Sequence, residues 1–202
     1  MFAVSKSPPD AKRGNVSCNI MELEIRQNKI SLGDTYEIFT NGKRTHSAFT
    51  IIRDGFTVLN LQKFPSDKIV LTIEALVGFF GPKYIIEKGD NAYYFRTLSW
   101  YKAHYQCICG DKTYDIYAHE ELRYSIYCNQ TMVGYWQGQA FVILEGDKYK
   151  ITLDANADQS MILSFCLIID RHFHNDNSTI NFNIGRLLPE TKSFDENWRP
   201  KD

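Results

Sequence analysis

The sequence predicts a mainly β protein: a closed antiparallel barrel of about twelve strands around one hydrophobic helix near the C-terminus. Three observations carry this prediction. Short apolar or alternating runs recur along most of the chain, separated by glycine-containing turn signals. The 12 tyrosines and 13 phenylalanines are spread among β-branched residues, as is typical of strands. One segment, residues 157–174, instead contains neither glycine nor proline.

The predicted strands alternate between apolar and polar residues, as in Tyr149, Ile151 and Leu153, which are interleaved with lysine and threonine. Between the strands, dipeptides such as Asn41-Gly42 and Asp54-Gly55 supply the positive φ angles of hairpin turns. An open sheet of this many strands would leave long unpaired edges, so a closed barrel is predicted. The twelve strands are expected at Met21–Arg26, Thr35–Thr40, Phe56–Leu61, Ile69–Ala75, Lys83–Glu87, Ala92–Leu98, Ala103–Cys109, Thr113–Ala118, Arg123–Cys128, Thr131–Trp136, Phe141–Leu144 and Tyr149–Leu153.

The segment 157–174 is predicted to be a helix. Asn156 and Gln159 have the spacing of a capping box, and Asp158 lies in the first turn, where negative charge is favoured. Its apolar residues cover all sides, yet the apolar stretch is about nine residues, far below the roughly 20 that span a bilayer. A helix threaded through the barrel is the remaining interpretation. Its expected core residues are Met161, Ile162, Leu163, Phe165, Cys166, Leu167, Ile168 and Ile169.

Composition and charge restrict the classes of function. With 202 residues, 44% of them hydrophobic and 23% charged, the chain suits one globular domain. The net charge of −1 provides no overall field for nucleic acid, so we expect no nucleic-acid partner. The first residues contain no apolar run of the kind that a signal peptide needs, and the five cysteines, an odd number, suit reduced thiols. We therefore expect a cytoplasmic protein, either free or peripheral at a membrane.

The order of elements, ending in Ile168-Ile169-Asp170-Arg171-His172-Phe173-His174, resembles the LURP-one-related branch of the tubby C-terminal-like superfamily. The segments Gly33-Asp34-Thr35-Tyr36-Glu37-Ile38 and Gly81-Pro82-Lys83-Tyr84-Ile85-Ile86 look like strand starts of that branch. The resemblance covers about residues 20–175. It implies a twelve-stranded barrel around a central helix, and tubby-type members bind phosphoinositide head groups through basic residues.

Three regions are expected. Residues 1–19 form a flexible arm, residues 20–176 the tubby-like barrel, and residues 177–202 a C-terminal extension. The extension begins with the alternation Ile180, Phe182 and Ile184, which suggests one further strand. Its last dozen residues are expected to be mobile unless Phe194 or Trp198 docks on the barrel.

Basic residues interleaved with aromatic ones are the first candidate site, because this mixture suits lipid head groups. The alternative is an ordinary barrel exterior. The residues in question are Lys83, Lys88, Arg96, Lys102 and Lys112.

Two further clusters are candidate metal or acid–base sites. Asp170 and His174 are four residues apart and share a helix face, but they also fit the polar end of a buried helix. Cys107 and Cys109 lie on one strand face, with Cys128 a candidate third thiolate for zinc, whereas free cysteines commonly pack as small hydrophobes. No cofactor is expected.

The sequence contains no nucleophile-elbow, phosphate-loop or dinucleotide motif. The leading hypothesis is a non-enzymatic binding or tethering module that contacts membrane head groups. The alternatives are a protein interaction scaffold, or a metal-dependent enzyme that uses the Asp170 and His174 cluster.

Overall fold

A computed structural model describes residues 20–28, 35–76, 83–99, 104–139, 148–175 and 192–201. Within these residues the chain forms twelve strands, one α-helix and one short 3₁₀ helix. The elements are β1 (Met21–Asn28), β2 (Thr35–Thr40), β3 (Lys43–Arg53), β4 (Phe56–Lys63), β5 (Lys68–Leu76), β6 (Lys83–Lys88), β7 (Asn91–Ser99), β8 (His104–Cys109), β9 (Lys112–Ala118), η1 (Glu120–Leu122), β10 (Arg123–Cys128), β11 (Thr131–Gln139), β12 (Lys148–Leu153) and α1 (Gln159–Asn175).

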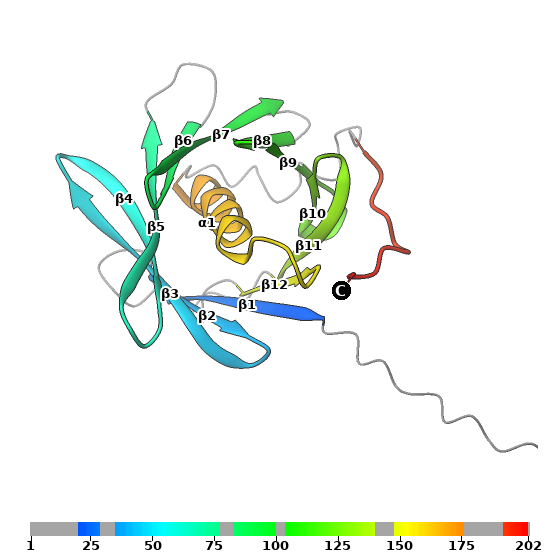
Figure 1. The fold of residues 1–202 in the computed structure, drawn as a ribbon, viewed down its shortest axis with the longest axis horizontal. Coiled ribbons are helices and arrows are strands. Elements are labelled where there is room, and N and C mark those ends of the chain that lie inside the picture. Colours follow the sequence, from blue (N-terminus) through cyan, green and yellow to red (C-terminus); the bar gives the residue numbers. More distant parts are fainter. Residues whose placement is uncertain are drawn as a thin grey trace, which may run out of the picture.

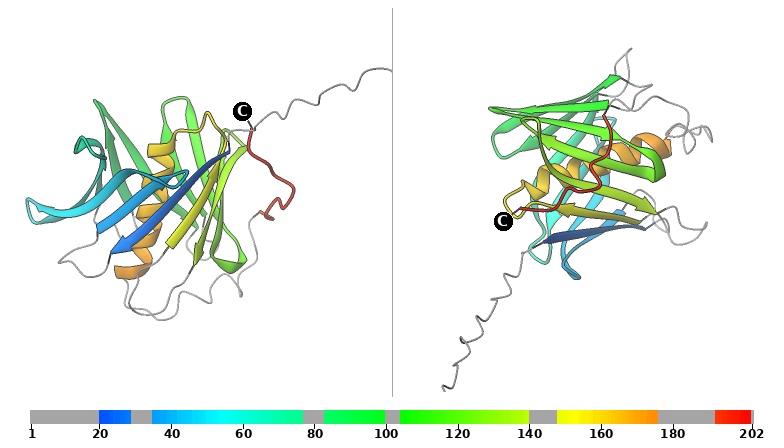
Figure 2. Two further views of the ribbon diagram at one scale, coloured as in Figure 1. Left: turned by 90° about the horizontal axis from the view of Figure 1, so that it is seen from below. Right: turned by 90° about the vertical axis from the view of Figure 1, so that its right-hand side faces the viewer.

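The strands form a closed antiparallel barrel, as predicted. Each strand pairs with the next one in the chain, and β1 pairs with β12 to complete the circle, with Ile25 opposite Tyr149. Figure 1 shows α1 running obliquely inside the ring of strands, and Figure 2 shows the helix from two further sides. Closure gives each strand a partner on both sides, which removes the exposed edges that favour aggregation.

The core lies between α1 and the inward faces of the strands. The eight apolar helix residues expected there are each at most 3% exposed. Phe165 is central: its ring centroid lies 5.7 Å from that of Phe95 on β7 and 5.3 Å from that of Tyr114 on β9. The helix therefore packs against strands around its circumference, which explains why its apolar residues do not form a single stripe.

One strand differs from the prediction. β3 was not expected, although both of its flanking turns, Asn41-Gly42 and Asp54-Gly55, were identified and do adopt positive φ angles. Its first half is polar, and a register shift between Ile38 and Phe39 of the neighbouring strand interrupts the alternation. The expected strand at 141–144 and the alternation at 180–184 lie outside the described residues.

The helix begins at Gln159, and Asp158 is its N-terminal cap. The Oδ1 atom of Asp158 accepts hydrogen bonds from the Met161 backbone N–H at 3.3 Å and from the Ser160 hydroxyl at 2.9 Å. The capping box proposed for Asn156 was therefore wrong by two residues. Asp158 can satisfy an N–H group of the first turn, which is what a capping side chain must do.

Residues 192–201 lie on the outside of the barrel, where Figure 2 draws them in red beside β10 and β11. The Trp198 indole N–H donates to the Met132 carbonyl at 3.0 Å, and the ring of Phe194 contacts Tyr135 at 5.5 Å. At the far end, the Lys201 backbone N–H donates to Asp154 Oδ1 at 2.7 Å. Both aromatic residues singled out in the extension thus dock.

Among the described helices, none has the length and hydropathy needed to cross a bilayer.

Replacement of Phe165 by alanine tests the central helix. The Phe165 side chain is fully buried between two rings, so we expect a loss of about 3–5 kcal/mol in the free energy of unfolding. Urea denaturation followed by fluorescence measures this loss. Phe56→Ala is the matched control, because Phe56 is 49% exposed; an equal loss in the two variants would contradict a core built on α1.

Candidate binding surface

Six residues on consecutive strands stand directly opposite one another on the outer face of the barrel, and we call them the outer apolar row. Their partners in the register run from β3 to β8 without interruption. On β5 to β8 the adjacent residues Ile73, Ile86, Phe95 and Cys107 belong to the core, so the row faces outward there, whereas on β3 the adjacent Ile52 is itself 81% exposed. The row consists of Ile51, Val58, Glu74, Ile85, Tyr94 and Ile108.

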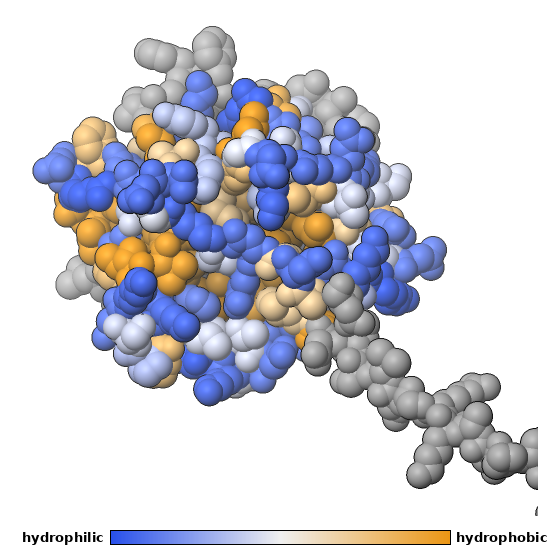
Figure 3. Space-filling view, in the orientation of Figure 1, coloured by the Kyte–Doolittle hydropathy of each residue, from blue (hydrophilic) through white to orange (hydrophobic). Residues whose placement is uncertain are grey.

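Three members of the outer apolar row are exposed, whereas Val58 is fully buried and Ile85 is half-buried. Tyr94 is 62% exposed, Ile108 49% and Ile51 38%. Its one charged member, Glu74, is paired with Arg53, whose guanidinium nitrogen lies 2.8 Å from the carboxylate. Figure 3 shows apolar side chains gathered on the side of the barrel where Figure 1 draws β3, β4 and β5. Scattered apolar residues are ordinary on a surface, but Tyr94 and Ile108 are both exposed and directly opposite each other, which makes this face a candidate contact surface.

A pair of cations borders this row. Lys83 and Arg96 stand directly opposite each other on β6 and β7. Each lies two residues along its strand from a row member, Ile85 and Tyr94 respectively. Arg96 donates to the side-chain oxygen of Gln106 at 2.7 Å. Like charges in directly opposed positions destabilise a sheet, so this arrangement is not one that folding favours.

The opposite border of the row carries a carboxylate that has a cationic neighbour. Glu87 lies two residues from Ile85 on β6, on the side away from Lys83 and opposite Thr72 on β5. Its carboxylate lies 3.8 Å from the Arg53 guanidinium. The row therefore has cations along one side and an exposed carboxylate along the other.

The other predicted basic residues lie elsewhere. Lys88 is at the far end of β6 and donates to both carboxylate oxygens of Asp158 at 2.8 and 2.7 Å. Although burial favours the neutral acid, the Lys88 ammonium and the hydrogen bonds from Ser160 and Met161 lower the pKa of Asp158. Lys88 thus holds the start of the helix. Lys112 opens β9 at the same end, and Lys102 lies outside the described residues.

Asp170, a candidate ligand or acid–base group that also fits the polar end of a buried helix, anchors the helix. Only 3% of it is exposed, and its carboxylate accepts hydrogen bonds from the hydroxyls of Tyr36, at 2.7 Å, and Tyr149. The side chain of His174 lies outside the described part of the structure. Within that part, no group of three or more histidine, cysteine, aspartate or glutamate residues is placed to hold a metal ion.

His119 is a buried residue that the sequence analysis did not single out. It is 4% exposed, its Nε2 atom lies 2.7 Å from the Ser125 hydroxyl, and its ring packs edge-on against Phe194. Burial, helped by the positive charge of Arg123 and opposed by Glu196, lowers the pKa of His119 to about 4. The C-terminal segment creates this environment because its Phe194 covers the His119 ring, and the sequence around His119 does not show that contact.

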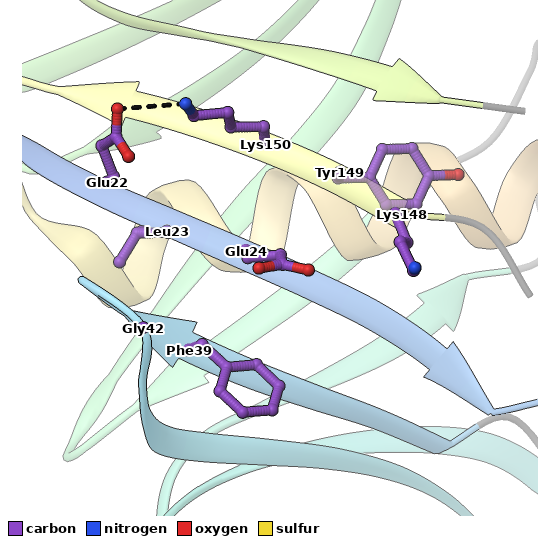
Figure 4. A pocket seen from close by; sticks show the side chains of 8 residues that line it. All are labelled: Glu22, Leu23, Glu24, Phe39, Gly42, Lys148, Tyr149 and Lys150. Atoms are coloured by element: carbon purple, nitrogen blue, oxygen red, sulfur yellow. Dashed lines mark ion pairs between the residues drawn. The ribbon is translucent and has the colours of Figure 1, made fainter.

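A shallow pocket of about 240 Å³ lies on the outside of β1, β2 and β12, shown in Figure 4. Its charged groups are paired with neighbouring ones. Lys150 lies 3.1 Å from Glu22, and Glu24 accepts a hydrogen bond at 2.7 Å from Arg26, which lowers the pKa of Glu24. This compensation makes the pocket a weaker candidate for a charged ligand than the Lys83 and Arg96 pair.

Comparison with known protein families, curated proteins and solved structures gave no match to this chain.

Replacement of Tyr149 by phenylalanine tests the anchor at Asp170. The change removes one hydroxyl donor from a buried carboxylate, so we expect a loss of about 1.5–3 kcal/mol in unfolding free energy. Tyr94→Phe, in which the hydroxyl lost belongs to a largely exposed side chain, serves as the control and should change stability little. If Tyr149→Phe is as stable as the control, the hydroxyl does not anchor the helix.

The pH dependence of stability tests the environment of His119. A histidine in the unfolded chain titrates near 6.5, whereas His119 in the folded protein titrates near 4. Between these values the unfolded state binds more protons, so this residue makes stability fall as the pH falls from about 6.5 toward 4. Urea midpoints at several pH values should therefore depend less on pH in His119→Gln than in the native protein. Identical pH profiles would contradict this environment.

Proposed function

We propose that this protein is a non-enzymatic binding module whose outer apolar row, with Lys83 and Arg96 beside it, docks a protein segment that carries apolar and acidic side chains. The observation that carries the proposal is the direct opposition of two cations next to exposed apolar side chains. An acidic group from a partner relieves their repulsion, and the apolar side chains supply the contact area.

The exposed residues of the row resemble binding hot spots in chemistry. Tyr94 presents a large ring with a polar end, and Arg96 offers a planar donor group that suits a carboxylate. Both residues are on β7 and two positions apart, so they project from the same side of one rigid strand. A site on strands of a closed barrel loses little conformational freedom when a partner binds.

The interior of the barrel is filled, which favours a binding site on the outer face. The apolar side chains of α1 occupy the space inside the strands and form one buried cluster with them. A small ligand or a fatty chain would have to displace this helix. The outer face is therefore the part of the barrel that best accommodates a partner.

Membrane head groups are the second candidate, favoured by the exposed Phe56 and Leu98 at the same end of the strands as Lys83. The membrane reading is the weaker one. Attraction to anionic lipids commonly uses four to eight clustered basic residues. Of the five basic residues considered, only Lys83 and Arg96 are directly paired in the described residues, while Lys88 is engaged by Asp158.

Selection of displayed random peptides on the purified protein tests the proposal. We expect the selected peptides to combine aromatic or aliphatic residues with aspartate or glutamate, and to bind at least tenfold more weakly to Lys83→Glu/Arg96→Glu and to Tyr94→Ser. Lys43→Glu and Ile69→Ser are matched controls, since they change an exposed lysine and an exposed isoleucine away from the row. Binding that survives the charge reversal would overturn the proposed surface.

Flotation with anionic vesicles forms the second arm of the experiment. Binding to vesicles that weakens with salt and disappears in Lys83→Glu/Arg96→Glu, without selection of acidic peptides, would replace the protein partner by a membrane surface. The proposal for a protein partner expects no such flotation at physiological salt.

A further inference from the structure

The side chains of two cysteines lie next to each other near the C-terminal end of β8. Cys107 and Cys109 are alternate residues on the inward face of the strand, and their Sγ atoms lie 3.5 Å apart. Alternate Cα atoms in an extended strand are about 6.6 Å apart, which is at the upper end of the span that a disulfide bridges. Cys109 is the last residue of β8 and precedes Gly110, which has a φ of 62°, so the chain bends directly after the pair.

The two thiols differ in accessibility. Cys107 is fully buried, whereas Cys109 is half-buried near the end of the barrel where the helix begins. An incoming reagent therefore reaches Cys109 first. Cys107 is placed behind it, within contact distance of the same sulfur, as a second thiol that completes a reaction begun at Cys109.

The surroundings favour the thiolate at Cys109. A hydrogen bond from Cys107 is the main cause that lowers the pKa of Cys109; burial and Asp158 oppose it, while the positive charges of Lys88 and Lys112 assist. The same hydrogen bond, together with burial, raises the pKa of Cys107. The proton therefore stays on the buried sulfur and the nucleophilic sulfur is the accessible one.

We propose that Cys107 and Cys109 form a dithiol site that reacts with small disulfides such as glutathione disulfide and closes into a reversible intramolecular disulfide. The Cys109 thiolate attacks one sulfur of the reagent and releases a glutathione thiolate, which gives a mixed disulfide. Cys107 then loses its proton and attacks Cys109 Sγ, and a second glutathione leaves as the thiol. Two protein thiols are oxidised, and one glutathione disulfide is reduced to two glutathione thiols.

The site has a direct connection to the outer face. Ile108 lies between the two cysteines and belongs to the outer apolar row, opposite Tyr94. A bond between residues 107 and 109 draws the strand together at Ile108, so oxidation changes the shape of the proposed docking surface. This consequence rests on the proposed function, whereas the chemistry at the two sulfurs does not.

Mass spectrometry of the folded protein after incubation with glutathione disulfide tests the proposal. The experiment uses the full chain with Cys18 replaced by serine, because Cys18 lies outside the described residues. We expect this protein to lose two hydrogens without retaining glutathione, and peptide mapping to place the bond between residues 107 and 109. A dithiol reductant should restore both thiols.

Three variants distinguish the roles of the two sulfurs. Cys107→Ser should stop at one glutathione bound to Cys109, and Cys109→Ser should retain a free thiol at Cys107. Cys128→Ser, which changes a half-buried cysteine two strands away, should behave as the parent protein does. Circular dichroism verifies that each variant is folded.

Peptide mapping of the disulfide in the parent protein tests the proposal without relying on any variant. Two intact thiols at residues 107 and 109 after prolonged exposure, or a bond that joins either of them to Cys128 or to a second chain, would overturn the proposal. A disulfide between 107 and 109 with unchanged peptide binding would leave the redox site standing and remove only its connection to the outer apolar row.

Discussion

The structure depends on one constraint: a single apolar helix must fill the inside of a closed barrel. The twelve strands present alternate side chains inward, and α1 provides the apolar surface against which they pack. Neither part is stable alone, since the helix is apolar on all sides and the strands would enclose an empty space. Contacts such as those of Phe165 with Phe95 and Tyr114 therefore join the C-terminal helix to strands that precede it by about 50 to 70 residues.

Polar interactions fix the helix at its two ends. Lys88 and Asp158 join β6 to the start of α1, while Tyr36 and Tyr149 donate to Asp170 toward its other end. Apolar packing is weakly directional, whereas these hydrogen bonds set the depth and rotation of the helix. Residues that sequence patterns mark as candidates for ligand binding or catalysis are thus used to position the helix.

With the interior occupied, the outer face carries the features that folding does not explain. The outer apolar row and the opposed Lys83 and Arg96 run against the usual rules for a solvated sheet, and such local conflicts are characteristic of functional surfaces. β8 connects the two faces, because Ile108 points outward between two inward thiols. The proposed disulfide on the core side would therefore alter the proposed docking surface through one strand.

The sequence alone determined the barrel and its central helix, because both follow from local periodicity: alternation for strands, and a run that is apolar on all sides for the helix. It missed β3, whose polar first half lacks that alternation. Only the tertiary structure decided which basic residues are neighbours. Lys83 and Lys88 are an odd number of positions apart on β6, so one faces outward beside Arg96 and the other faces inward to Asp158. Likewise, Tyr36 reaches Asp170 across 134 residues, a contact that barrel closure creates and that no local pattern encodes.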